Sequence, residues 1–143
     1  MITWVKGRHE YWWNILLDRV YVPKQFNRTM PKIKFTTRPS KVAGRACNNW
    51  CEYNLNYVLQ EQGTYDDTIC HEVCHTFAER LIPGTKHYNL WAYLYNIVCS
   101  ANRGRYHDYK IVNRKNQAEE IKKIEELLKM QVVLKKISAC MKQ

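Results

Sequence analysis

One helical segment with two histidines a turn apart constrains this chain more than any other feature. His71-Glu72-Val73-Cys74-His75 has the form HExxH, and between Thr68 and Phe77 Glu72 is the one Asp, Glu, Lys or Arg. Residues four apart on a helix lie on the same face, so both imidazoles can hold one metal ion. Such a segment is expected to be a buried helix whose polar side chains open into a cleft.

The flanking residues set the expected ends of this helix. Thr64-Tyr65-Asp66-Asp67 has the Ser/Thr-x-x-acid form of a capping box, and acidic residues suit a first helical turn. Pro83-Gly84 interrupts the pattern at the other end. We therefore predict a helix from Tyr65 to Leu81.

The motif predicts a catalytic zinc (Zn2+) site. His71 and His75 are the expected ligands, and Glu72 is placed to act on a zinc-bound water as general base. Zinc lowers the pKa of such a water to about 7. A catalytic zinc needs a third protein ligand, for which His87 beyond the Pro83-Gly84 break is the candidate. The rival third ligands are Glu79, His107 and His9, and Glu79 is alternatively a hydrogen-bond acceptor for a ligand imidazole.

The rest of the chain predicts an α+β fold of helices on a small sheet. Lys32 to Thr36 and Glu52 to Asn56 alternate polar and apolar residues, as strands do, with a turn at Asn48-Asn49 between them. An exposed strand edge near Glu52 to Asn56 is a candidate site for binding the substrate backbone as an added strand. Further helices are expected over Arg8 to Val20, Tyr88 to Ala101, and Asn113 to Lys142, the last long and amphipathic.

Charge is distributed unevenly over the 143 residues, whose net charge is +10. Residues 1–45 hold ten Lys/Arg against two Asp/Glu, residues 46–102 hold two against six, and residues 103–143 hold eleven against five. Two basic flanks of this kind favour a polyanion, DNA first. Trp4, Trp12 and Trp13 lie near basic residues and are candidates for base stacking, with a core position favoured for Trp13.

Several classes of protein are excluded by the composition. No run of about eighteen apolar residues exists to span a membrane, and Met1 to Glu10 lacks the order of a signal peptide. The six cysteines are therefore read as reduced thiols of a cytoplasmic protein, and we expect a monomer without a membrane partner.

Four segments together resemble the SprT-like (Spartan-related) zinc metallopeptidase family over about Met30 to Tyr109. One of them is the metal helix itself. Val42 to Ala46 is similar to the family's small-residue segment after the first strand, and Tyr53 to Asn56 is similar to its second strand. His87 with Leu90-Trp91 is similar to the element that carries the third ligand. Arg105 to Tyr109 is similar to a segment that follows in some members.

The resemblance implies a zincin-type domain with helices packed on a small antiparallel sheet. It implies His71, His75 and His87 as zinc ligands and Glu72 as catalytic acid/base of a metalloendopeptidase that hydrolyses DNA-associated proteins. Residues 1–110 would form this domain, and residues 111–143 a C-terminal basic amphipathic helix. Candidate oxyanion donors are Tyr88, Arg105, Tyr106 and His107.

The sequence also differs from that family. It has no CxxC motif, where many members carry a zinc ribbon, and Tyr88 follows His87, where glycine is common. The alternative function is a non-catalytic module that binds nucleic acid or protein and has a structural zinc site. A structural site has four protein ligands and needs no general base, so the presence of Glu72 favours the enzyme.

Overall fold

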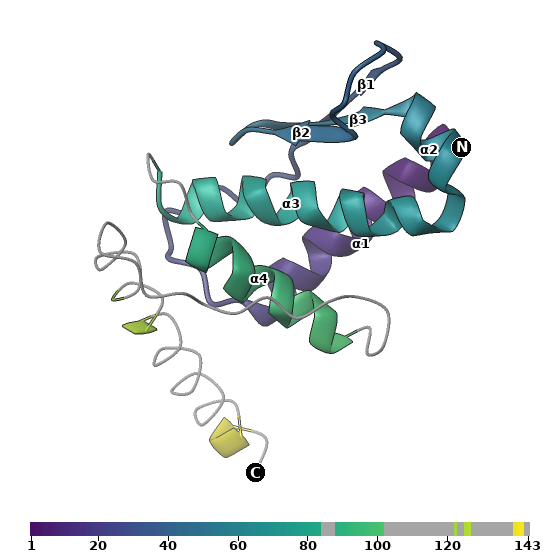
Figure 1. Cartoon of the computed structure of the whole chain (residues 1–143). Helices are drawn as coiled ribbons and strands as arrows, with labels where there is room; N and C mark the ends of the chain where they lie inside the picture. The colour runs from purple at the N-terminus through teal and green to yellow at the C-terminus, as the bar shows by residue number, and fades with distance from the viewer. Residues whose placement is uncertain (84–87, 102–121, 123–124, 127–138, 142–143) are drawn as a thin grey trace.

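A computed structural model describes residues 1–83, 88–101, 122, 125–126 and 139–141, and this part of the chain has an α+β architecture (Figure 1). The elements, in chain order, are α1 (Ile2–Arg19), β1 (Lys32–Thr36), β2 (Gly44–Ala46), β3 (Trp50–Asn54), α2 (Leu55–Glu61), the 3-10 helix η1 (Gln62–Thr64), α3 (Tyr65–Leu81) and α4 (Tyr88–Ala101).

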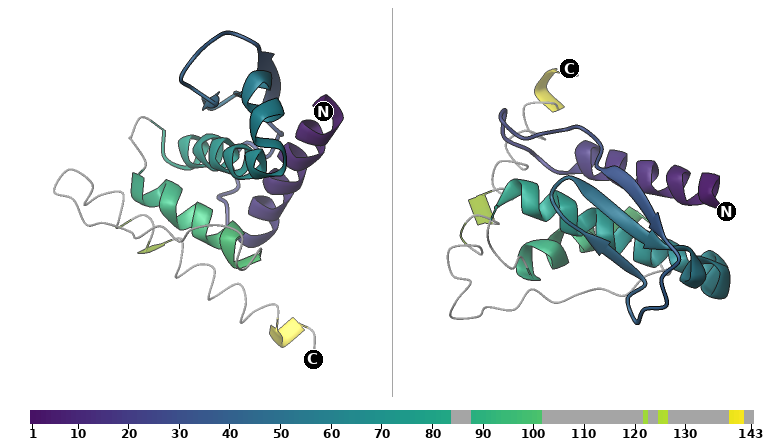
Figure 2. Two further views of the ribbon diagram at one scale, coloured as in Figure 1. Left: turned by 45° about the vertical axis from the view of Figure 1, so that its right-hand side comes forward. Right: turned by 90° about the horizontal axis from the view of Figure 1, so that it is seen from above.

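Helix α3 is the central element of the structure. The sheet lies on one side of it and α4 on the other, while α1 packs alongside (Figures 1 and 2). This position explains why α3 is uncharged over most of its middle, since a helix covered on several sides must be apolar nearly all round. Its buried side chains include Ile69, Val73 and Phe77.

The three strands form a mixed sheet in the order β1-β3-β2, so the expectation of an antiparallel sheet is wrong. β2 and β3 form an antiparallel hairpin, with a bend at Asn48 and Asn49 as predicted. The chain reverses between β1 and β2, and β3 is inserted between these strands. β3 therefore runs parallel to β1, with Lys32 opposite Trp50 and Thr36 opposite Asn54.

The two faces of the sheet differ as strand alternation requires. Cys51 and Tyr53 point inward and are fully buried, and Ile33 and Phe35 on β1 pack on the same core. Residues 52–54 belong to the central strand, which is paired on both sides. The expected free edge at Glu52 to Asn56 is therefore wrong, and Leu55 and Asn56 already belong to α2.

Helix α1 is six residues longer at its start than predicted and is joined to α3 by a partly buried polar cluster. Arg8 donates two hydrogen bonds of 2.9 Å to Asp66, and the Trp12 indole N–H donates another of 2.9 Å to the same carboxylate. Trp13 is in the core, as expected. Burial of Trp12 and Trp13 excludes both from base stacking, while Trp4 is exposed.

The predicted capping box at the start of α3 is wrong. Thr64 has helical backbone angles, because η1 leads directly into α3, and its side chain makes no capping hydrogen bond. The Thr64 hydroxyl instead donates to the carbonyl of Glu61 at 2.7 Å. The predicted bounds of the helix, Tyr65 to Leu81, are nevertheless confirmed.

Helix α4 has the predicted bounds, and its Leu90, Leu94 and Val98 side chains are fully buried. The Asn113 to Lys142 helix and the division of the chain at residue 110 fall almost entirely outside the described residues. Among the described helices, none combines the length and the apolarity that a membrane span requires.

Candidate metal centre

The two imidazoles of the HExxH motif face each other on α3. Nε2 of His75 lies 3.0 Å from Nε2 of His71. Two zinc–nitrogen bonds of 2.0–2.1 Å at a tetrahedral angle would place their nitrogen atoms about 3.3 Å apart. The pair therefore fits a shared zinc ion to within a few tenths of an ångström.

The surroundings of His71 favour its neutral imidazole, the form that binds a metal. Burial lowers the pKa of His71, and the nearby Asp67 carboxylate opposes that shift. The His71 side chain is still 40% exposed, so a ligand can reach it from solvent. Asp67 is one helical turn before His71, and sequence reasoning did not assign it to the site although the four-residue spacing indicates it.

Glu72 lies beside this pair and is mostly enclosed. Its Oε1 is 4.0 Å from Nε2 of His71, and its side chain is 9% exposed. Burial raises the pKa of Glu72 to about 7, which suits a group that both accepts and donates a proton near neutral pH. A bound dication would favour the carboxylate and lower this pKa again.

Strand β2 approaches Glu72 closely because residue 44 is glycine. A Cβ atom at Gly44 would lie 3.0 Å from Cγ of Glu72 and 3.3 Å from Cγ2 of Thr68. The small-residue segment was recognised in the sequence, but its contact with Glu72 was not. The absence of a side chain at Gly44 lets the sheet pack directly on the motif.

Aromatic side chains of α4 pack against the histidine pair. The Trp91 ring stacks on His75 at a centroid distance of 5.3 Å and lies 4.6 Å from the His71 ring. The Trp91 indole N–H donates to the His71 carbonyl at 3.0 Å. Tyr95 stacks on Trp91 and hydrogen-bonds to Asp67, so α4 contacts the site on two successive turns.

The third ligand is not settled by the described residues, because His87 and His107 lie outside them. Within the described part of the chain, no group of three His, Cys, Asp or Glu side chains converges to hold a metal. Glu79 therefore does not join the histidine pair in this conformation. His9 is buried between the Tyr53 hydroxyl and the Pro31 carbonyl, 2.7 and 3.0 Å away, which excludes it as a ligand.

The candidate oxyanion donors also lie outside the description. Arg105, Tyr106 and His107 are not described, and of Tyr88 only the backbone is.

Cys51, under the first turn of the motif, is no candidate ligand. Its thiol contacts the Thr76 hydroxyl at 3.3 Å, and burial raises its pKa to about 12.

Comparisons with models of protein families, with curated proteins and with solved structures found no match for this chain. The chemistry of the site therefore carries the functional argument.

Proposed function

We propose that this protein is a zinc-dependent metalloendopeptidase of the zincin type, with Glu72 as its general base. The observation that carries the proposal is the 3.0 Å approach of the His71 and His75 Nε2 atoms, with the Glu72 carboxylate 4.0 Å from the first. Two adjacent imidazoles and one enclosed carboxylate are the groups that metal-assisted hydrolysis of a peptide bond requires.

His71 and His75 would hold the zinc ion, and His87 would complete the protein ligands. Trp91 in the first turn of α4 touches both imidazoles, and His87 directly precedes α4 in the sequence, which supports this assignment. When bound, zinc supplies a Lewis acid and lowers the pKa of a coordinated water.

Glu72 would carry the proton through the reaction. Its carboxylate accepts a proton from the attacking water and later delivers it to the leaving nitrogen of the peptide. Burial, which raises the pKa of this carboxylate, favours that return of the proton, and a bound dication opposes the shift. Trp91 would hold the ring of His75 in place by stacking.

The alternative, a binding module with a structural zinc site, fits this geometry less well. Structural zinc sites are closed by four protein ligands, often thiolates. Here the described site offers two imidazoles, one of them 40% exposed, beside a carboxylate with a raised pKa. We further propose an intracellular protein that acts on DNA-associated substrates, based on its basic flanks.

The test combines metal content with peptidase activity in Glu72→Gln. The variant should retain about one zinc per chain and lose peptidase activity at least a hundredfold, because general acid–base catalysis contributes that much or more. Zinc is measured by elemental analysis and cleavage with a casein substrate, with and without DNA.

Glu79→Gln is the matched control, since it removes a carboxylate two turns further along the same helix. It should retain both zinc and activity. His87→Ala should lose most of both. Full activity in Glu72→Gln would overturn the hydrolase proposal, and full zinc content in His87→Ala would reassign the third ligand.

A further inference from the structure

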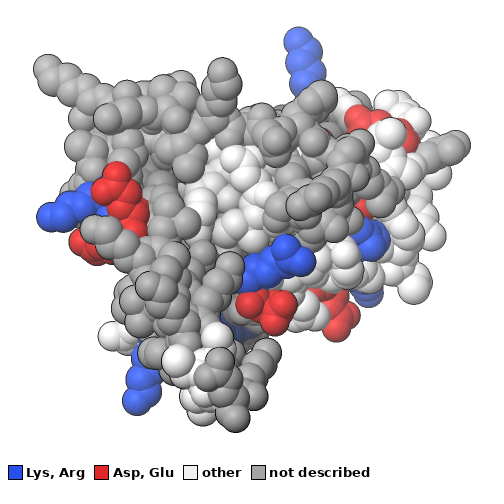
Figure 3. Space-filling model, turned by 90° about the horizontal axis from the view of Figure 1, so that it is seen from below, with Lys and Arg blue, Asp and Glu red and all other residues white. Residues whose placement is uncertain are grey.

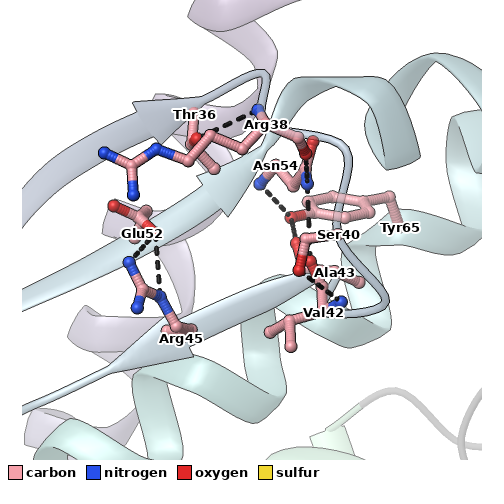
Figure 4. A network of polar contacts seen from close by, with 9 residues as sticks. All are labelled: Thr36, Arg38, Ser40, Val42, Ala43, Arg45, Glu52, Asn54 and Tyr65. Atoms are coloured by element: carbon pink, nitrogen blue, oxygen red, sulfur yellow. Dashed lines mark hydrogen bonds and ion pairs between the residues drawn. The ribbon is translucent and has the colours of Figure 1, made fainter.

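The outer face of the sheet gathers basic side chains from segments that are separate in the sequence. Strand alternation places Lys32 and Lys34 of β1 and Arg45 of β2 on the face that points away from α3. Arg38, just beyond β1, lines the same surface (Figure 4). These four residues, all exposed, are called the basic sheet face here.

One acidic residue lies among these four cations. Glu52 of the central strand is paired in register with Lys34 on one side and Arg45 on the other. It accepts two hydrogen bonds from Arg45, at 2.6 and 2.9 Å. Lys34 instead lies over the Trp50 ring, its Nζ 4.5 Å from the centroid. The basic sheet face therefore keeps a net positive charge after Glu52 is counted.

A shallow pocket opens between the two arginines. Its volume is about 160 Å³, and its lining includes Arg38, Arg45, Thr36, Ser40, Glu52 and Asn54. The Arg38 guanidinium makes no hydrogen bond or ion pair with any residue in the described part of the chain. Arginine forks are suited to binding phosphate oxygens.

The segment that carries Arg38 is held in place by hydrogen bonds (Figure 4). The buried Asn54 amide donates to the Arg38 carbonyl at 3.0 Å, and the Tyr65 hydroxyl donates to the Ala43 carbonyl at 2.6 Å. The Tyr57 hydroxyl donates to the Ser40 carbonyl at 2.7 Å. The backbone beneath Arg38 is thus fixed before any ligand arrives, which lowers the entropic cost of binding.

The described residues on the opposite side of the molecule carry charges of both signs (Figure 3). In the view from below, blue and red side chains lie next to each other among the described residues (Figure 3). No described element covers the outer face of the sheet when it is seen from above (Figure 2). A predominantly basic, uncovered face attracts polyanions more strongly than one with balanced charges.

We propose that the basic sheet face binds the sugar–phosphate backbone of DNA. The choice of partner rests on the proposed function, whereas the surface is chosen from the structure. Insertion into a membrane surface requires large apolar side chains that are free to enter it. The aromatic ring on this face, Trp50, is half-buried and lies beneath Lys34. Its lysines and arginines suit phosphate contacts that do not depend on base sequence.

The test is the affinity of the full chain for a short labelled DNA duplex, measured by fluorescence anisotropy over a range of salt concentrations. The double variant Lys34→Ala/Arg38→Ala should bind at least about tenfold more weakly at low salt. The slope of log affinity against log salt concentration should be smaller in magnitude by about two, because each lost phosphate contact removes about one released counterion.

The matched control is Lys6→Ala/Lys24→Ala, which removes two exposed cations outside the basic sheet face. It should bind within about threefold of the unmodified chain. Equal losses in the two double variants, or no loss in either, would overturn the proposal. So would loss of binding to anionic lipid vesicles, but not to DNA, in Lys34→Ala/Arg38→Ala.

Cleavage of a DNA-free peptide substrate separates this inference from the proposed function. Lys34→Ala/Arg38→Ala should cleave it at the unmodified rate, and Glu72→Gln should bind DNA with unmodified affinity. If Lys34→Ala/Arg38→Ala bound DNA more weakly and no form of the protein showed peptidase activity, the DNA-binding proposal would be supported and the peptidase proposal overturned. Peptidase activity with unweakened DNA binding in that variant would do the reverse.

Discussion

His9 shows how one buried side chain can make stability depend on pH. Its ring is fully buried on α1, with Nδ1 2.7 Å from the Tyr53 hydroxyl and Nε2 3.0 Å from the Pro31 carbonyl. Burial lowers the pKa of His9 from 6.5 to about 4. The neutral ring can donate to the carbonyl and accept from the hydroxyl at once, and protonation removes the acceptor.

This shift predicts a loss of stability in mild acid. Below pH 6.5 the unfolded chain takes up a proton at His9 that the folded chain does not accept until about pH 4, so the free energy of unfolding falls between these values. Between pH 7 and pH 5 the fall attributable to His9 is about 2 kcal/mol. Urea denaturation of the metal-free protein at both pH values measures it.

The comparison that isolates His9 is the same measurement on His9→Gln. Other groups also titrate in this range, and Glu72 shifts in the opposite direction, so the difference between the two proteins is the informative quantity. His9→Gln should be less stable at pH 7 and should lose about 2 kcal/mol less on acidification. Parallel pH profiles would contradict the assignment.

At the scale of elements, the contact between β2 and α3 links the sheet to the site. Gly44 is positioned opposite the inward-facing Tyr53, and a Cβ there would lie 3.3 Å from the Glu52 carbonyl and 3.0 Å from Cγ of Glu72. Such distances are too short for a side chain without some displacement. The fit of β2 against α3 therefore depends on glycine.

Gly44→Ala should damage both stability and catalysis. Overpacking of this kind costs about 1–3 kcal/mol, and displacement of Glu72 should lower peptidase activity about tenfold or more. The checks are urea denaturation of the metal-free protein and the casein assay. The reason is steric, so Gly44→Ser should be no better tolerated.

Gly7→Ala is the contrasting substitution. Gly7 is exposed on α1, and a Cβ there would meet nothing within 4 Å. Alanine at this position should raise the free energy of unfolding by about 0.5–1 kcal/mol, because glycine weakens a helix interior. If Gly44→Ala also raised the free energy of unfolding, the steric account of Gly44 would be wrong.

At the scale of the whole molecule, the proposed site brings together α3, α4 and the sheet. α3 supplies the imidazoles, α4 packs Trp91 on them, and the sheet approaches Glu72 through Gly44. The Arg8–Asp66 ion pair fixes α1 to the same helix. A metal ion held by this assembly would bind the folded chain and not the unfolded one, so binding and folding must be coupled.

Zinc should therefore stabilise the whole fold. At free zinc a hundredfold above its dissociation constant, the free energy of unfolding should rise by about 2.7 kcal/mol. Thermal denaturation with zinc and with a chelator measures this change. His71→Ala and His75→Ala should abolish it, while His107→Ala should retain it. Stabilisation by zinc in both His71→Ala and His75→Ala would place the metal elsewhere.

The sequence by itself determined the helices that carry the site. Residue spacing predicted α3, with its two histidines on one face, and it also predicted α4, because helical periodicity and the Pro83-Gly84 break are local properties of the chain. The strand Lys32–Thr36 followed from alternation for the same reason. The capping box failed although it is local, since α2 and η1 run directly into α3.

Only the tertiary structure decided how these elements meet. The strand order and the parallel pairing of β1 with β3 join residues that are distant in the sequence. The same is true of the approach of Gly44 to Glu72, and of the hydrogen bonds from Arg8 and Trp12 to Asp66. Periodicity shows which face of an element is apolar, but not which other element covers that face. That choice is made by the packing of the complete core, in which each side chain must fit the space that the others leave.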